Sequence, residues 1–239
     1  MKIAVISDIH ANVEAFKAVI DHMKQQGVEK VIFLGDLVMN GPCPKEVLTM
    51  INDLNPIVWI KGNTDNWFEE IDSNFKPNNE REEYIYSLYQ YANERLNNEE
   101  IRMLLSKPEK QLIEIEGVRI LCVHGSHKSI SEPIGIMTPL VNIEQLVTEI
   151  DADILLCGHT HMPYYASFKG KKIINVGAVS LSLDGEAKAS YEILEIKQKN
   201  IICTSFKIDY DLEKTINCAI LNKFPYVDLY IKRLNEAKF

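Results

Sequence analysis

Short apolar runs alternate with amphipathic stretches over the first sixty residues of the chain. After the first run, apolar residues recur at three- and four-residue spacing, which is the pattern of a helix that buries one face. These residues are Val13, Phe16, Val19, Ile20 and Met23. Strands that alternate with helices pair in parallel within one sheet. The pattern therefore predicts strands at 2–7, 30–34 and 57–60 and helices at 12–26 and 44–54.

Strand patterns joined by turns dominate the chain after residue 110. The turns Glu116-Gly117, Lys169-Gly170 and Lys199-Asn200 each separate two β-rich runs, and each predicts a hairpin. Because both halves of the chain carry strands and helices, we expect an α/β fold. The specific expectation is a four-layer αββα sandwich, with two mixed β-sheets packed face to face and helices outside. Further helical patterns cover 142–149, 211–222 and 225–234.

Residues 66–106 interrupt this alternation of strands and helices. The segment is polar and helix-prone, so we expect a helical excursion that covers the functional site. No linker rich in Pro, Ser or Gly and no block of like charge divides the chain. At 239 residues the chain has the length of one large domain, and we expect residues 1–239 to form a single domain.

Composition and charge exclude several classes of protein. Hydrophobic residues make up 46% of the chain, yet no apolar run approaches the roughly 18 residues of a membrane span. The net charge is −8 and the longest basic cluster is Lys169-Gly170-Lys171-Lys172, so a long nucleic acid is not an expected partner. The five cysteines form no CxxC pair and match a reducing compartment. We expect a cytoplasmic protein without membrane contact.

Polar side chains gather where the predicted strands end, and open α/β sheets bind their ligands at such ends. Carboxylate, carboxamide and imidazole groups bind Mn²⁺, Fe, Zn²⁺ or Ni²⁺, whereas a thiolate-selecting site would use cysteine. Five segments of the chain carry seven such groups on Asp, Asn and His side chains. One ion that keeps a position open for water takes fewer ligands than this from protein, so two ions are expected. The segments are Asp8-Ile9-His10, Gly35-Asp36, Gly62-Asn63-Thr64-Asp65, Val123-His124-Gly125 and Gly158-His159-Thr160-His161.

The order of these five segments resembles the calcineurin-like metallophosphoesterases, and the resemblance spans nearly the whole chain. It includes the later motif Asn175-Val176-Gly177-Ala178. Asn12 after the first segment and Gly41-Pro42 after the second are similar to the branch of small bacterial phosphodiesterases and diadenosine-tetraphosphate hydrolases. The resemblance implies a metallophosphoesterase domain that hydrolyses phosphodiester or pyrophosphate bonds of a small, nucleotide-like phosphorylated substrate.

The resemblance also implies how two divalent transition-metal ions are bound. A hydroxide held by the ions would attack phosphorus while both ions neutralise the phosphoryl oxygens. Manganese is the metal we expect first, with iron, zinc or nickel as alternatives. The expected ligands are Asp8, His10, Asp36 and His161 for one ion and Asp36, Asn63, His124 and His159 for the other, with Asp36 as the bridge.

The segment around Asn63 departs from the family pattern. Many members have a histidine that protonates the leaving group where this chain has Thr64, and a threonine hydroxyl is not a general acid near neutral pH. Asp65 would partner that histidine and loses the role here. Good leaving groups are therefore favoured, unless His127 supplies the proton. The catalytic candidates are Thr64, Asp65 and His127.

Two further residues are candidates for substrate binding. Asn12 begins the first predicted helix, where it either caps the helix or binds phosphate at the helix N-terminus. Trp67 follows the third segment and either stacks on a base or packs in the interior.

Two other functions compete with a small-molecule phosphoesterase. The first is a catalytically inactive protein-binding scaffold of the same fold, against which the complete set of seven ligands argues. The second is a nuclease for short oligonucleotides or cyclic nucleotides, which the acidic net charge disfavours only for longer substrates. The sequence leaves the oligomeric state open, and a homo-oligomer is compatible with it.

Overall fold

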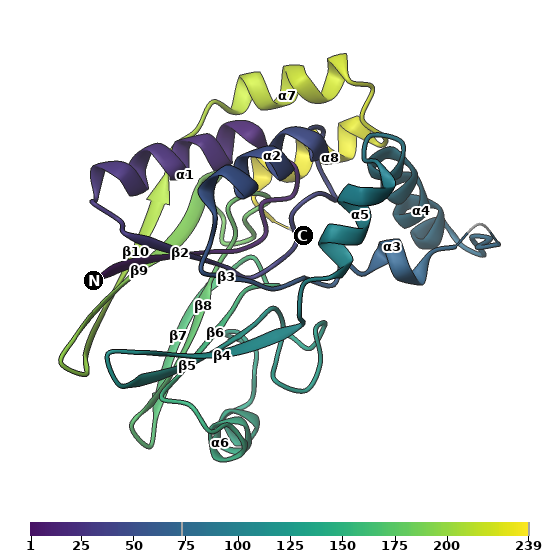
Figure 1. Ribbon diagram of the computed structural model, residues 1–239. Coiled ribbons are helices and arrows are strands. Elements are labelled where there is room, and N and C mark those ends of the chain that lie inside the picture. The colour runs from purple at the N-terminus through teal and green to yellow at the C-terminus, as the bar shows by residue number, and fades with distance from the viewer. Residues whose placement is uncertain (73, 239) are drawn as a thin grey trace.

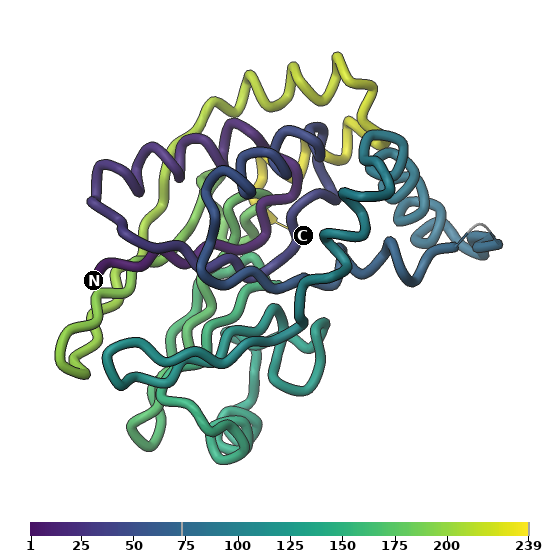
Figure 2. The backbone as a smooth tube through the Cα atoms, in the orientation of Figure 1, coloured from purple at the N-terminus to yellow at the C-terminus, as the bar shows by residue number. Residues whose placement is uncertain are grey.

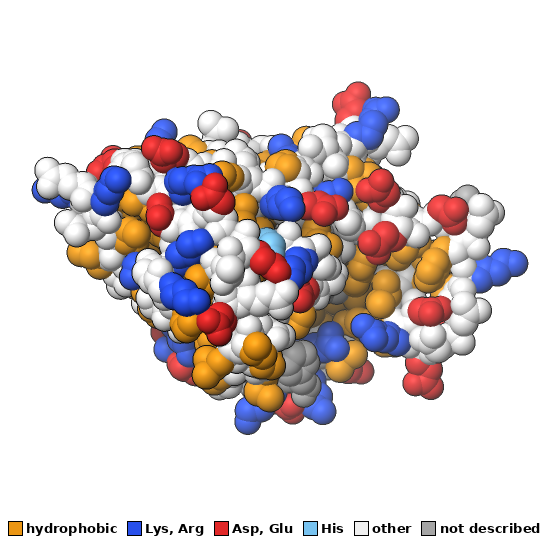
Figure 3. All heavy atoms as spheres, turned by 90° about the horizontal axis from the view of Figure 1, so that it is seen from below, with side chains coloured by type: hydrophobic (Ala, Val, Ile, Leu, Met, Phe, Trp, Pro, Cys, Tyr) orange, Lys and Arg blue, Asp and Glu red, His pale blue; other side chains and the backbone are white. Residues whose placement is uncertain are grey.

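Two five-stranded mixed β-sheets pack against each other, and helices cover their outer faces (Figure 1). The computed structural model describes residues 1–72 and 74–238. The expected αββα arrangement is confirmed. On the face that carries the second sheet, acidic and basic side chains are intermixed with hydrophobic ones (Figure 3).

The first sheet consists of β1 (Lys2–Ile6), β2 (Lys30–Phe33), β3 (Val58–Trp59), β9 (Ala189–Lys197) and β10 (Asn200–Ile208). Their spatial order is β10-β9-β1-β2-β3. Strands β1, β2 and β3 are parallel, whereas β9 is antiparallel to both β1 and β10. The three strands predicted within the first sixty residues therefore form one side of this sheet, and the hairpin β9–β10 forms the other.

The second sheet consists of β4 (Lys110–Ile115), β5 (Val118–Val123), β6 (Ile154–Cys157), β7 (Pro163–Phe168) and β8 (Lys171–Val176). Their spatial order is β4-β5-β6-β8-β7. Strands β5, β6 and β8 are parallel, and the hairpin partners β4 and β7 run antiparallel at the two edges. All three predicted hairpins are therefore present.

Side chains of β1 alternate between two cores, which explains its unbroken apolar run. Ile3 and Val5 belong to the core between the sheets, together with residues of β5, β6 and β8. Ala4 and Ile6 belong to the core between the first sheet and its helices. Each of these four side chains is fully buried. The central strand is thus fixed on both faces, and so is the start of the loop that follows it.

Helices cover both sheets on their outer sides. Phe16 and Val19 of the first helix are fully buried against the first sheet, as the three- and four-residue spacing predicts. No helix within the described residues has the length and apolar character needed to cross a membrane. On the side of the first sheet lie α1 (Val13–Gln25), α2 (Pro44–Leu54), α7 (Leu212–Leu221) and α8 (Val227–Glu236), and below the second sheet lies α6 (Leu140–Glu149) (Figure 1).

Between β3 and β4 the chain forms the predicted helical excursion, which extends to one side of the sandwich (Figure 2). Leu88 and Tyr91 of the excursion pack with Phe224, Tyr230 and Leu234 near and within α8. The excursion therefore rests on the C-terminal helices. It comprises α3 (Trp67–Glu70), α4 (Glu80–Asn93) and α5 (Asn98–Leu105).

Candidate metal centre

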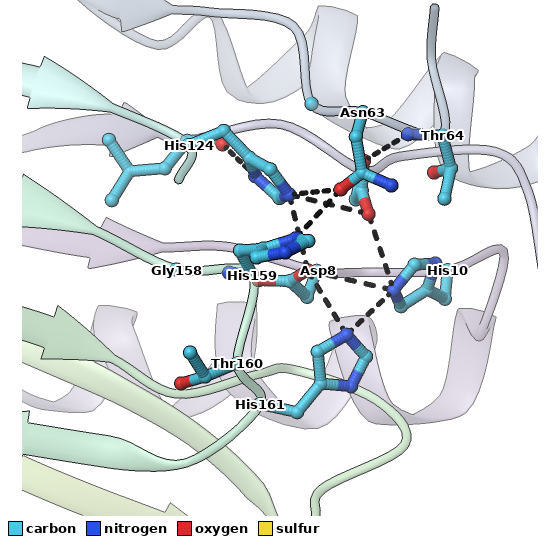
Figure 4. A network of polar contacts seen from close by, with 12 residues as sticks. Asp8, His10, Asn63, Thr64, His124, Gly158, His159, Thr160 and His161 are labelled. Carbon is cyan, nitrogen blue, oxygen red and sulfur yellow. Dashed lines mark hydrogen bonds and ion pairs between the residues drawn. The ribbon is translucent and has the colours of Figure 1, made fainter. Parts of the chain in front are cut away.

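The candidate ligands labelled in Figure 4 converge where strand ends of the two sheets meet, and Asp36 lies with Asp8 and His124 in the same centre. Parallel pairing sends the carboxyl ends of β1, β2 and β3 to one edge of the first sheet, and those of β5 and β6 to one edge of the second. Asp8 and His10 follow β1, Asp36 follows β2, Asn63 follows β3, His124 follows β5, and His159 and His161 follow β6.

Five of the seven residues have a left-handed backbone, which residues other than glycine rarely adopt. Their φ angles lie between 46° and 66°. Each such conformation costs about 1–3 kcal/mol and persists only where the surrounding structure enforces it. Strain of this kind clusters at functional sites, and here it falls on the ligand positions themselves. The five residues are Asp8, His10, Asp36, His159 and His161.

Two close approaches between ligand loops require glycine. A Cβ atom on Gly62 would lie 2.0 Å from Asp36 Oδ1 and 2.5 Å from the Asp36 nitrogen. A Cβ atom on Gly158 would lie 2.1 Å from Ser7 Oγ and 2.6 Å from Asp8 Oδ2. A side chain at either position would therefore push a ligand loop out of place.

Backbone carbonyls orient three of the histidines. Nδ1 of His10, His124 and His161 donates to a carbonyl oxygen at 3.1, 2.7 and 2.7 Å, respectively. This bond directs Nε2 of each ring toward the centre, which is how metal-binding histidines are usually held. The acceptors are the carbonyl oxygens of Met39, Leu34 and Leu181.

One group of donor atoms surrounds Asp8. Its Oδ1 lies 3.2 Å from His161 Nε2 and 3.6 Å from His10 Nε2, and the two Nε2 atoms are 3.0 Å apart. Asp8 Oδ1 is buried and has no hydrogen-bond partner within the described part of the chain. Oxygen and nitrogen lone pairs that point at one another in this way fit a bound divalent cation.

The second group of donor atoms lies around Asn63 and Asp36. Asn63 Oδ1 is 3.0 Å from His124 Nε2 and 2.8 Å from His159 Nδ1. Asp36 Oδ2 is 3.4 Å from His124 Nε2 and 3.7 Å from His10 Nε2, so it faces both groups. In each of the sets Asp8–His10–His161 and Asp8–Asp36–His124, the ligand atoms lie within 4.8 Å of one another.

Opposite charges compensate one another inside this buried centre. Burial alone would raise the pKa of the carboxyl groups and lower that of the imidazoles. Against that effect, His124 and His10 lower the pKa of Asp36 to about 2, and Asp36 and Asp8 raise the pKa of His124 to about 10. In the same way, His161 and His124 hold the pKa of Asp8 well below its usual range. The carboxylates are therefore ionised and available to a cation.

Asp65 holds the loops of Asp36 and Asn63 together. Its carboxylate accepts backbone N–H groups from Gly62 at 2.8 Å, Asp36 at 2.9 Å and Leu37 at 3.1 Å. Burial and the nearby charge of Asp36 raise the pKa of Asp65 to about 6. These contacts support a positioning role for this catalytic candidate. Sequence reasoning missed that role because the partners are backbone amides.

The other two catalytic candidates lie in different surroundings. The Thr64 N–H donates to Asp36 Oδ1 at 2.9 Å, and the buried Thr64 hydroxyl has no hydrogen-bond partner among the described residues. His127 Nε2 lies 2.8 Å from Glu149 Oε2 at the end of α6. The structure thus places Thr64 beside the ligands and pairs His127 with a carboxylate outside them.

The two candidates for substrate binding have structural contacts. Asn12 caps α1, because its Oδ1 accepts the Ala15 N–H at 3.1 Å, and it also accepts the Thr215 hydroxyl at 3.2 Å. Its Nδ2 donates to Ser180 Oγ at 2.9 Å. Trp67 is half-buried against the cluster that joins α4 and α8. These contacts favour capping and packing, and a role in substrate binding stays a prediction for both residues.

A cavity of about 700 Å³ opens beside His159 and His161. One wall is the loop 132–139, in which Ile136 and Met137 are 72% and 87% exposed. Arg233 of α8 and Lys238 add positive charge. The described residues of 66–106 do not line this cavity, so the helical excursion forms none of its walls, and its expected place over the metal centre stays a prediction. Sequence reasoning missed the cavity because its walls come from distant segments.

Comparison with known proteins identifies the family of the chain. Residues 1–199 match the model of the calcineurin-like phosphoesterase superfamily domain. An uncharacterised protein of Methanocaldococcus jannaschii is 29% identical over 245 residues, which cover 93% of each chain. The phosphodiesterase YfcE of Escherichia coli is 24% identical over 205 residues, which cover 82% of this chain and 88% of YfcE.

The fold also matches solved structures. The crystal structure of a metallophosphoesterase from Sphaerobacter thermophilus has a TM-score of 0.82 and 26% sequence identity, and the match covers 99% of each chain. The similarity therefore extends over both sheets and the C-terminal helices.

Replacing Asp65 with alanine tests its positioning role. A buried N–H without an acceptor costs about 1–3 kcal/mol, so we expect Asp65→Ala to lower the free energy of unfolding by about 3 kcal/mol or more. Because the ligand loops would lose their link, Mn²⁺ affinity should fall roughly 10- to 100-fold. Urea denaturation and isothermal titration calorimetry measure the two effects. Asp53→Ala, at an exposed position of α2, is the control. Unchanged Mn²⁺ affinity in a folded Asp65→Ala protein would contradict this role.

Proposed function

The chain belongs to the calcineurin-like phosphoesterase superfamily, and from that premise we propose that it hydrolyses phosphodiester or pyrophosphate bonds of a small phosphorylated substrate in a metal-dependent reaction. The observation that carries the proposal is the convergence of oxygen and nitrogen donors from both sheets beside a cavity. Such donors favour divalent transition-metal ions over the metals that thiolates select.

We assign the donors to two divalent ions. Asp36 Oδ2 faces His10 on one side and His124 on the other, which supports it as the bridging ligand. Manganese is the metal expected first, with iron, zinc and nickel as alternatives that the same donors accept. The assigned ligands are Asp8, His10, Asp36 and His161 for one ion and Asp36, Asn63, His124 and His159 for the other.

When bound, such ions would activate a water molecule and neutralise charge on the phosphoryl oxygens. The protein positions the oxygen and nitrogen ligand atoms before the ions bind. Backbone carbonyls fix His10, His124 and His161 with Nε2 inward. Asp65 fixes the spacing between the loops of Asp36 and Asn63. A phosphate then enters a site whose side chains need little rearrangement, which lowers the cost of reaching the transition state.

We place the organic part of the substrate in the adjoining cavity. Its volume of about 700 Å³ is that of a small-molecule site. Ile136 and Met137 offer apolar surface to a base or aryl group, while Arg233 and Lys238 offer charge to a further anionic group. A nucleotide-like molecule combines both features. The mixed charges of the face in Figure 3 do not form the continuous basic surface that a long nucleic acid requires.

We further propose that the enzyme favours good leaving groups. Thr64 stands where many relatives of this family have a histidine, and it carries no group that protonates a leaving oxygen near neutral pH. His127, the alternative donor, is paired with Glu149. Charge on the departing oxygen is then relieved mainly by the leaving group itself, so aryl oxides and nucleoside phosphates are favoured over alkoxides.

The activity and its metal dependence can be measured directly. Protein reconstituted with Mn²⁺ should hydrolyse bis-p-nitrophenyl phosphate, and chelation should abolish the hydrolysis. Asp36→Asn should lower kcat/KM by roughly 100-fold or more, and by more than Asp8→Asn, because it would disturb both ions. Elemental analysis should show reduced metal content in Asp36→Asn. Asp21→Asn, at an exposed position of α1, is the matched control. Hydrolysis that survives chelation, or small and equal losses in the two ligand variants, would refute the assignment.

A graded series of aryl and alkyl esters tests the leaving-group preference. The rate should fall steeply as the pKa of the leaving alcohol rises, and Thr64→His should flatten that dependence by supplying a donor. His127→Ala should leave the dependence unchanged. A flat dependence in the unmodified enzyme that becomes steep in His127→Ala would instead make His127 the proton donor.

A further inference from the structure

Cys43 and Cys218 face each other between α2 and α7, although 175 positions separate them in the sequence. Their Sγ atoms are 2.9 Å apart. Nonbonded carbon atoms, which are smaller than sulfur, pack best at roughly 3.5–4.0 Å. A disulfide bond is about 2.05 Å long, so the two sulfurs need to approach by less than about 1 Å to bond. The pair is closer than ordinary packing and close to bonding.

Both thiols are held by well-defined structure. Cys43 stands at the N-cap position of α2 and is followed by Pro44, its N–H donates to the Ala11 carbonyl oxygen, and Cys218 lies within α7. The side-chain amide of Asn222 donates to Cys218 Sγ at 3.3 Å and lies 3.9 Å from Cys43 Sγ. The two sulfurs are therefore brought together by two helices and a shared polar neighbour.

A small oxidant has access to the pair. A cavity of about 160 Å³ lies against both cysteines, which is ample for hydrogen peroxide. Cys218 is half-buried, whereas Cys43 is only 7% exposed. Burial, the Cys218 thiol and the acidic Glu46 and Glu14 raise the pKa of Cys43. Cys218 is consequently the sulfur that an oxidant meets first.

We propose that Cys43 and Cys218 are a modification site at which a hydroperoxide forms a reversible intramolecular disulfide. The Cys218 sulfur attacks one peroxide oxygen, the O–O bond breaks, and the other oxygen leaves as an alcohol or water. The Cys43 sulfur then attacks the Cys218 sulfur, the S–O bond of the sulfenic acid breaks, and water leaves with the Cys43 proton. In total, two thiols and one hydroperoxide give a disulfide, water and the alcohol or a second water.

The bond would tie α7 to the start of α2, which contacts the loop that follows β1. The Cys43 N–H donates to the carbonyl oxygen of Ala11 at 3.1 Å, directly after the candidate ligand His10. On α7, the Thr215 hydroxyl donates to Asn12 Oδ1 at 3.2 Å. The cross-link would close a long loop of chain and thereby restrict the unfolded state. We expect it to raise the Tm by roughly 5–10 °C.

The test is oxidation of the full chain with hydrogen peroxide, followed by thiol counting and peptide mapping under non-reducing conditions. We expect two of the five thiols to disappear together, a peptide pair that joins Cys43 to Cys218, and recovery of both thiols with dithiothreitol. The oxidised protein should show the higher Tm. Cys203→Ser, which keeps the pair, should behave as the unmodified protein does, while Cys43→Ser and Cys218→Ser should lose the cross-link and the rise in Tm.

Three outcomes would overturn the proposal. These are retention of all five thiols under conditions that oxidise glutathione, a disulfide that includes Cys203, or a disulfide between two chains. Peptide mapping of the oxidised protein with its original sequence identifies the disulfide without any variant. A serine variant that fails to fold therefore does not affect the conclusion. The outcome is also independent of the phosphoesterase assay.

Discussion

Two buried carboxylates, Asp8 and Asp36, have to lie near each other at the centre of this molecule, and their mutual repulsion must be balanced. Positive charge at this point balances it, either a proton on His124 or a divalent cation held by the same donors, since His124 Nε2 lies 3.9 Å from Asp8 Oδ1 and 3.4 Å from Asp36 Oδ2. The carboxylates come from the first sheet, whereas His124 and His161 come from the second. The centre therefore exists only when the two sheets are packed together, which makes the sandwich itself a condition for metal binding.

The buried strands β1 and β2 hold the candidate ligands that follow them in a strained backbone conformation. The left-handed conformations at Asp8 and Asp36 are unfavourable by themselves. They follow β1 and β2, whose side chains are buried on both faces and cannot shift without opening two cores. Asp65 adds three hydrogen bonds to the loops that leave β2 and β3. Packing energy from the cores thus offsets local strain at the ligand positions.

Periodic patterns in the sequence predict helices and strands whose buried side chains repeat at regular spacing. They do not predict single contacts between side chains that are distant in the sequence. Phe16 and Val19 reveal α1 because a buried helical face repeats, and the hairpins follow from their turns. The strand expected at 57–60 is shorter, at Val58–Trp59, because β3 pairs with β2 only through these two residues. The convergence of the ligands is predictable from strand ends. The contacts of Asp65 and the pairing of Cys43 with Cys218 are not, since neither leaves a pattern along the chain.

The family match ends at residue 199, and the residues beyond it bear on how bond cleavage and substrate selectivity are separated. The family match covers residues 1–199 and includes all seven candidate ligands. Arg233 and Lys238, which line the cavity, lie beyond it, as does Cys218. Under the proposed function, bond cleavage depends on the matched part, and contacts to the rest of the substrate depend in part on α8. Relatives that keep the ligands but differ in their last forty residues should then share the reaction and differ in substrate.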